Sequence, residues 1–111
     1  MAKGVFIGLV DNDDLLTKNA LYEVVNVLNT NKNIDFIYSD EDKMDLNGMR
    51  CFPHFKPDFS PDTLMSLNYI CHFSVIRKSI IKKVGGFEVG LEGAQDHDLF
   101  LKISEVTNKF Y

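Results

Sequence analysis

The stretch VFIGLVDNDDLL, residues 5–16, joins a run of apolar residues directly to a cluster of three aspartates. A short, continuous apolar run is typical of a strand that is buried on both faces of a sheet. We therefore expect a strand over residues 4–10 that ends at the acidic cluster. Ligands of open α/β sheets bind beyond the carboxyl ends of the strands. The stretch thus predicts an α/β fold with its aspartates at a binding edge.

The segments downstream alternate between helical and strand patterns. Apolar residues at helical spacing predict a helix over residues 15–28. β-Branched and aromatic residues predict strands over residues 34–39 and 69–76. Four smaller features complete the pattern: a DLNG turn between two short strands, a short helix that Ser60 caps, a helical turn ended by glycine within residues 77–87, and an amphipathic helix over residues 93–106.

Length, charge and cysteine content narrow the class of protein. The 111 residues suffice for one small domain. A net charge of −4 argues against a nucleic-acid binder, because phosphate contacts need clustered Lys and Arg. No apolar run is long enough to span a bilayer and no signal segment opens the chain, so we expect a cytoplasmic protein. Cys51 and Cys71 lack metal-site spacing and are expected to be reduced thiols.

The aspartates after the first strand have two interpretations. The carboxylates of Asp11 and Asp13 can converge on one divalent cation, which prefers hard oxygen ligands. Alternatively, an aspartate caps the helix that follows and complements its dipole, and Asp14 is the best placed for this role. Capping accounts for one aspartate but not for three, so the pattern favours a metal site.

A second acidic cluster, Asp40, Glu41 and Asp42, follows the strand expected over residues 34–39. If the two strands are parallel neighbours, both clusters face one crevice, where a cation or a polyol ligand would offset their repulsion. The alternative is a solvated loop in which Lys43 is the counter-ion.

The last helix opens with the sequence QDHD, residues 95–98. Asp96 and Asp98 either complement the helix dipole or, if one lies at a cleft, act as a general base. His54 and His72 lie among aromatic residues and are expected to be packed and hydrogen-bonded, whereas His97 is expected on the helix surface.

In their order along the chain, four segments resemble glycosyltransferase family 2, the inverting enzymes with a GT-A fold. These are GLVDNDDLLTKNALYEVV, DFIYSDEDK, FKPDFSPDTLMSLNYI and VGGFEVGLEGAQDHDLFLKISE. The resemblance implies a Rossmann-like three-layer sandwich with a mixed sheet and flanking helices. Residues 1–111 would form a single partial domain, a central-to-C-terminal piece that lacks the N-terminal strands.

The resemblance also implies roles for individual residues. Asp11 and Asp13 match the DxD motif, which binds Mn²⁺ or Mg²⁺ and the nucleotide-sugar donor. Asp96 matches the catalytic base, and Gln95 replaces the Glu that commonly precedes it. The sugar and acceptor side would comprise Asp40, Glu41, Asp42, Asn68, His72, Gly85, Gly86, Phe87 and Gln95.

The implied reaction moves a sugar from a nucleotide-sugar, with UDP as the nucleotide, to a hydroxyl group of a saccharide or glycolipid. Its setting would be cell-surface polysaccharide or glycolipid synthesis at the inner face of the membrane, with peripheral membrane association of the full-length protein. Because the nucleotide-binding half is missing, we expect the piece to be inactive alone and its exposed sheet edge to promote self-association.

Two other functions fit parts of the sequence. A receiver-type signalling domain has a similar size, acidic residues after its first strand and a downstream Lys-Pro, comparable to Lys56-Pro57. It requires its phosphoacceptor aspartate after a third strand, with two helices intervening, and only one helix is predicted between the acidic clusters. The other alternative is a non-catalytic carbohydrate-binding or interaction fragment with the same fold.

Overall fold

A three-stranded sheet with the order β1–β5–β2 forms the centre of the fold, and neighbouring strands are antiparallel. The computed structural model describes residues 2–111. Its strands are β1 (Phe6–Leu9), β2 (Phe36–Tyr38) and β5 (Ser74–Arg77). The expected α/β class is confirmed, but β1 and β2 are not neighbours, because β5 lies between them. The only parallel contact within the described residues is an isolated bridge between Phe36 and Phe110.

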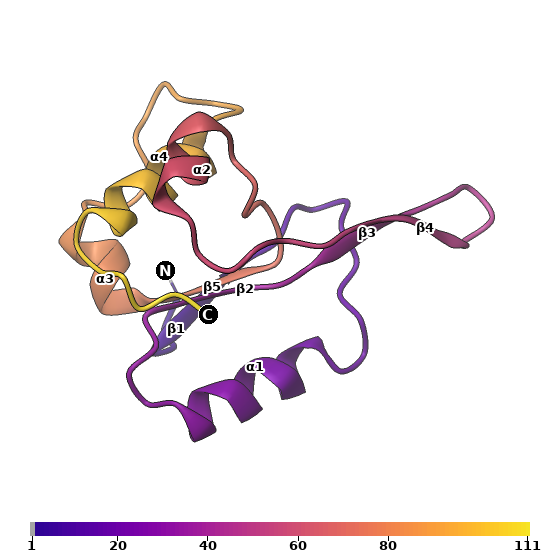
Figure 1. Cartoon of the computed structure of the whole chain (residues 1–111), viewed down its shortest axis with the longest axis horizontal. Helices are drawn as coiled ribbons and strands as arrows, with labels where there is room; N and C mark the ends of the chain where they lie inside the picture. The colour runs from indigo at the N-terminus through magenta and orange to yellow at the C-terminus, as the bar shows by residue number, and fades with distance from the viewer. Residues whose placement is uncertain (1) are drawn as a thin grey trace.

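Helices cover both faces of this sheet, which gives the expected three layers (Figure 1). Alternate residues of a strand point to opposite faces. Ile37 and Val75 therefore pack toward α1 (Ala20–Thr30). Phe36 and Ile76 pack toward the opposite layer, which contains α2 (Pro61–Ser66), α3 (Lys78–Lys83) and α4 (Gln95–Ser104).

The two edges of the sheet differ. The C-terminal segment runs along β2, where the backbone N–H of Phe36 donates to the carbonyl oxygen of Lys109 at 3.2 Å and that of Tyr111 donates to the carbonyl oxygen of Phe36 at 3.0 Å. Among residues 2–111, no strand pairs with the outer edge of β1. An unpaired edge is a template for strand addition, so self-association through β1 stays a prediction.

The helix expected over residues 15–28 begins only at Ala20. Leu15 and Leu16 are exposed, and the backbone N–H of Asp14 donates to the carbonyl oxygen of Asp11 at 3.2 Å in a turn. Consecutive Asp and Asn side chains favour turns over helix, because they compete for backbone hydrogen bonds. The prediction that Asp14 caps the helix is therefore wrong, and Asn19 occupies the capping position without a side-chain hydrogen bond.

Several predictions that rest on a few adjacent residues are confirmed. The DLNG turn joins β3 (Glu41–Met44) to β4 (Arg50–His54), and this hairpin projects from the body of the molecule (Figure 1). Ser60 caps α2 by accepting from the backbone N–H of Thr63 at 3.4 Å. Gly85 and Gly86 have φ of +87° and +77° and follow the end of α3. The last helix buries Leu99, Phe100 and Ile103.

Three further expectations, on a strand, the cysteines and membrane-spanning helices, can be compared with the structure. The strand expected over residues 69–76 is confined to β5, and residues 69–73 are irregular. Cys51 and Cys71 are both free thiols. Within residues 2–111, we find no helix whose length and hydropathy would allow it to cross a membrane.

Candidate functional site

The strand directions bring three chain segments together where the strands end. β1 and β2 are both antiparallel to β5, so the carboxyl ends of β1 and β2 lie beside the amino end of β5. Asp11 follows β1, and His72 precedes β5 at this end of the sheet. A cleft of about 700 Å³ opens here and is lined by Gly8, Leu9, Val10, Asp11, His72, Phe87, Glu88, Val89, Glu92, Gly93, Gln95 and Asp96.

Asp11 and His72, which line the cleft, belong to a group of side chains of the types that ligate metal ions. His72 Nε2 lies 3.2 Å from Asp11 Oδ2. Ligand atoms of Asp11, Asp14 and His72 lie within 4.8 Å of one another, and Asp13 does not belong to this group. The structure therefore places Asp14 and His72, rather than Asp13, beside Asp11. Sequence spacing had no signal for this arrangement, because the turn at residues 11–14 decides which carboxylates converge.

The ring of His72 lies beside Asp11, and the segment that carries it packs against β1. Its Nδ1 atom is buried and has no hydrogen-bond partner in the described part of the chain. The adjacent Phe73 ring lies against β1, where a Cβ atom added to Gly8 would be only 2.9 Å from Phe73 Cε2. Glycine in the strand thus permits the close approach of the segment that carries His72.

Asp96, in the first turn of α4, also lines the cleft. Asn68 Nδ2 donates to Asp96 Oδ2 at 2.9 Å, and Asn68 Oδ1 accepts from the backbone N–H of Cys71 at 3.3 Å. Gln95 Oε1 accepts from the backbone N–H of Gly93 at 2.9 Å. Asn68 therefore holds the carboxylate of Asp96, and Gln95 holds the loop before α4.

The second acidic cluster does not reach the cleft. Asp40 Oδ1 accepts from the backbone N–H of Lys56 at 2.8 Å, and Lys56 Nζ lies 3.0 Å from Glu41 Oε2. Asp42 Oδ2 pairs with Arg50 Nε at 2.5 Å across the hairpin. β3 begins soon after β2, so Glu41 and Asp42 lie on the hairpin and Asp40 lies just before it. Asp42 pairs within the hairpin, whereas Asp40 and Glu41 contact Lys56, which follows β4. Their counter-ions are Lys56 and Arg50, and the predicted role for Lys43 is not observed.

A glycine-rich loop forms the remaining wall. Phe87, which follows Gly85 and Gly86, lines the cleft with 49% of its surface exposed. Lys102 Nζ lies 3.0 Å from Glu88 Oε2 and 2.8 Å from Asp98 Oδ2. The carboxylates of Asp98 and then Glu88 raise the pKa of Lys102. Asp98 is thereby engaged with Lys102, which leaves Asp96 as the carboxylate of this helix that faces the cleft.

Two histidines differ from their expected environments. His54 is exposed and its Nδ1 atom lies 3.5 Å from Glu41 Oε1, so it is not packed among aromatic rings. His97 is half-buried rather than on the surface, and its Nε2 atom lies 2.7 Å from the carbonyl oxygen of Leu64. His97 thus connects α4 to α2.

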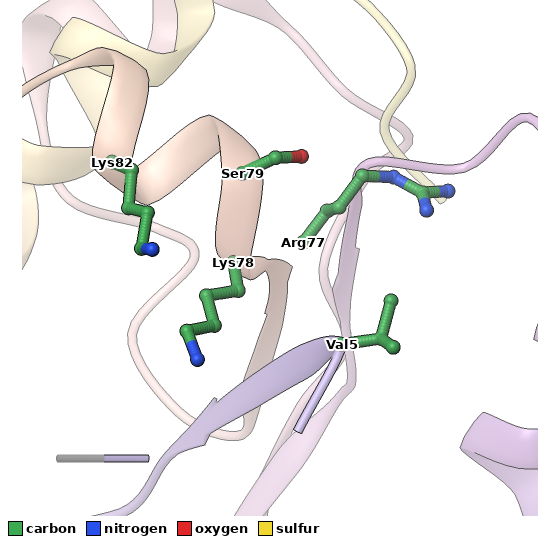
Figure 2. A pocket seen from close by; sticks show the side chains of 5 residues that line it. All are labelled: Val5, Arg77, Lys78, Ser79 and Lys82. Carbon is green, nitrogen blue, oxygen red and sulfur yellow. The ribbon is translucent and has the colours of Figure 1, made fainter. Parts of the chain in front are cut away.

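A smaller pocket of about 330 Å³ lies at the opposite end of β5 and is lined by Val5, Arg77, Lys78, Ser79 and Lys82. Figure 2 shows the Arg77 side chain directed away from Lys78 and Lys82. Arg77 Nε donates to Asp35 Oδ1 at 2.7 Å, and Lys78 Nζ donates to the carbonyl oxygen of Ala2 at 2.7 Å. Because its cations are engaged elsewhere or diverge, this pocket is not a candidate site.

Acidification should weaken the fold through Glu41. Burial opposes ionisation of this carboxyl, but hydrogen bonds and charge from Lys56 and then His54 outweigh burial and hold its pKa below the ordinary 4.5. The stabilisation is therefore present above the ordinary pKa and is lost as the pH falls through the lower, folded-state pKa. Urea midpoints measured between about pH 6 and about pH 3 should fall more steeply for the wild type than for Glu41→Gln. Parallel pH profiles for the two proteins would contradict this role.

The chain is similar to short parts of longer proteins, some of them named for O-antigen and chondroitin synthesis. No family model matches it. The chain is 45% identical over 105 residues to the uncharacterized protein y4gI of Sinorhizobium fredii, covering 95% of the chain and 12% of that protein. It is 42% identical over 106 residues to the O-antigen biosynthesis protein RfbC of Myxococcus xanthus, covering 96% of the chain and 8% of RfbC. It is 29% identical over 106 residues to a chondroitin synthase of Pasteurella multocida, covering 95% of the chain and 11% of the synthase. The chain thus spans about a tenth of the length of these relatives.

Proposed function

We propose that the chain is part of the catalytic domain of a metal-dependent, inverting glycosyltransferase of family 2, with a partial GT-A fold. The reaction moves a sugar from a nucleotide-sugar donor to a hydroxyl group of a saccharide or glycolipid in polysaccharide synthesis. The observation that carries this proposal is one cleft that is lined both by Asp11 beside His72 and by Asp96 held by Asn68. Similarity to proteins named for O-antigen and chondroitin synthesis supports the same reaction class.

Asp11, Asp14 and His72 would hold the divalent cation. Two carboxylates and an imidazole form a donor set that suits Mn²⁺ and, through the carboxylates, also Mg²⁺. A bound divalent cation would supply positive charge that offsets the negative charge of the donor diphosphate as the nucleotide leaves. The three side chains come from two segments, and the two aspartates are exposed, so they are accessible to a charged donor.

Asp96 is the proposed general base. Asn68 donates to its Oδ2 atom, so Oδ1 is the oxygen that we assign to accept the proton from the attacking hydroxyl group. Phe87 presents an exposed ring on the wall of the same cleft, where it offers an apolar surface to a sugar ring. Attack from the side opposite the leaving nucleotide inverts the anomeric carbon in one displacement.

The donor we propose is a UDP-sugar, and the proposed location is the cytoplasm, at the inner face of the membrane.

The receiver-type alternative gains no support from the fold. A receiver domain needs its phosphoacceptor aspartate after a third strand, on the same side as the other acidic residues. Here β5 is antiparallel to its neighbours and ends at Arg77, at the end of the sheet opposite the acidic residues. A non-catalytic saccharide-binding fragment would bind ligand in the cleft without turnover.

Donor binding tests the proposal. The longest polypeptide that carries this sequence should bind UDP in the presence of Mn²⁺ and lose at least about tenfold of that affinity when Mn²⁺ is omitted or Asp11 is replaced by Asn. Titration calorimetry measures both effects, and Asp62→Asn, which alters an exposed carboxylate of α2, is the control. Equal UDP affinity with and without Mn²⁺ would contradict the proposed metal role.

A further inference from the structure

The side chain of Lys56 is 1% exposed, although it carries a charge. Its ammonium group donates to Glu41 Oε2 at 3.0 Å, to the carbonyl oxygen of Ile70 at 2.5 Å and to that of His72 at 2.7 Å. An ammonium group has three donors, so all three are used. Burying a charge is costly unless it is paired and hydrogen-bonded, and one of the three acceptors is a carboxylate.

The two carbonyl acceptors lie on either side of Cys71, whose φ is +43°. A non-glycine residue in this region is strained and persists only where its surroundings hold it there. Three further hydrogen bonds hold the same segment: the N–H of Cys71 to Asn68 Oδ1 at 3.3 Å, Cys71 Sγ to the Asn68 carbonyl at 3.1 Å, and Ser74 Oγ to the Cys71 carbonyl at 2.8 Å. Residues 68–72, which we term the 68–72 turn, thus depend on side-chain contacts and not on helix or sheet.

The two ends of the 68–72 turn contact both acidic parts of the cleft. Asn68, at the first end, donates to Asp96 Oδ2 at 2.9 Å. His72, at the other end, lies 3.2 Å from Asp11 Oδ2. Lys56 contacts neither aspartate and does not line the cleft. Within the 68–72 turn, its ammonium group donates only to the backbone carbonyl oxygens of Ile70 and His72.

We propose that Lys56 is a positioning residue that fixes the 68–72 turn and so sets Asn68 against Asp96 and His72 against Asp11 together. The functional consequence rests on the proposed glycosyltransferase activity, but the positioning itself can be measured without turnover. Loss of the ammonium group releases the Ile70 and His72 carbonyls at once. Both contacts with the aspartates then loosen together, although neither aspartate has been changed.

Lys56→Met tests this role, because Met keeps an unbranched apolar stem and removes the donors. The side-chain amide signals of Asn68, observed by NMR, should move toward those of a solvent-exposed asparagine. The affinity of the chain for Mn²⁺ should fall about tenfold, as is typical when a residue that orients a metal ligand through hydrogen bonds is lost. Lys43→Met, at an exposed lysine of β3, should change neither quantity. Leu28→Ala, which destabilises the opposite face of the sheet, should lower stability but leave the Asn68 signals in place.

The two readouts separate the outcomes. If the wild type binds no Mn²⁺ but the Asn68 signals still move in Lys56→Met, the positioning role is supported and the proposed metal role fails. If the Asn68 signals and the Mn²⁺ affinity of Lys56→Met both match the wild type, the positioning role is overturned. Should Lys56→Met not fold, Glu41→Gln retains the lysine and removes its charged partner. Smaller displacements in the same direction are then expected, and unchanged signals would overturn the role.

Discussion

Replacing Asp96 by Asn should lower the rate of sugar transfer at least about 10²-fold while leaving the fold intact, because it removes the proposed general base. Asn has nearly the shape of Asp, and its amide oxygen can still accept the hydrogen bond that Asn68 now donates to Oδ2. The geometry of the cleft is therefore retained, whereas the capacity to take a proton from the acceptor hydroxyl group is lost.

Asp98→Asn is the matched control for this substitution. Asp98 lies on the same turn of α4 but pairs with Lys102 at 2.8 Å. We expect it to retain transfer within about threefold, since an ion pair at a partly exposed site contributes little. The measurement is nucleoside diphosphate release per unit time at saturating donor and acceptor. An Asp96→Asn rate equal to that of Asp98→Asn would exclude Asp96 as the base.

Phe36→Ala should lower the free energy of unfolding by about 3–5 kcal/mol, the range observed for truncation of a fully buried Phe. Phe36 is 0% exposed. Its ring centroid lies 5.1 Å from that of Phe100 in an edge-to-face arrangement and 4.7 Å from that of Phe110 in a stacked one. Loss of this ring therefore removes contacts both with α4 and with the C-terminal segment that pairs with β2.

A loss of that size is a large fraction of the 5–15 kcal/mol typical of small domains, so partial unfolding near room temperature is expected. Urea unfolding followed by circular dichroism measures the change. Phe52→Ala is the control, because Phe52 is 78% exposed on the hairpin and its truncation should change stability by less than about 0.5 kcal/mol. Similar losses in the two variants would contradict the position of Phe36 at the centre of the core.

Features that depend on a few adjacent residues could be predicted from the sequence. The Ser60 cap, the turn at Asp45 and the glycines after α3 each follow from the local chemistry of one or two side chains. The position of β5 between β1 and β2 could not be predicted, because periodicity reports which face a residue occupies and not which strand lies beside it. The predicted start of the first helix was several residues too early, because Leu15 and Leu16 fit the helical spacing of apolar residues but are exposed and do not pack on the sheet.

Some residues of the candidate site could likewise be predicted from the sequence, and others could not. Asp11 and Asp96 could be singled out, because each follows a recognisable element boundary. The convergence of Asp14 and His72 on Asp11 depends on a turn and on the approach of a segment about sixty residues away, and neither has a sequence signal. Lys56 offered a weak signal, since it is a single cation among aromatic residues and prolines in FKPDF, residues 55–59.

The most direct measurement is transfer from UDP-sugars to saccharide acceptors by the longest polypeptide that carries this sequence, with Mn²⁺ present and absent. The wild type should release UDP and form a product with inverted anomeric configuration only when Mn²⁺ is present. Asp11→Asn and Asp96→Asn should each strongly lower UDP release and product formation, for Asp96→Asn at least about 10²-fold. Transfer at the wild-type rate in Asp11→Asn and Asp96→Asn would contradict the assignment of this cleft as the active site.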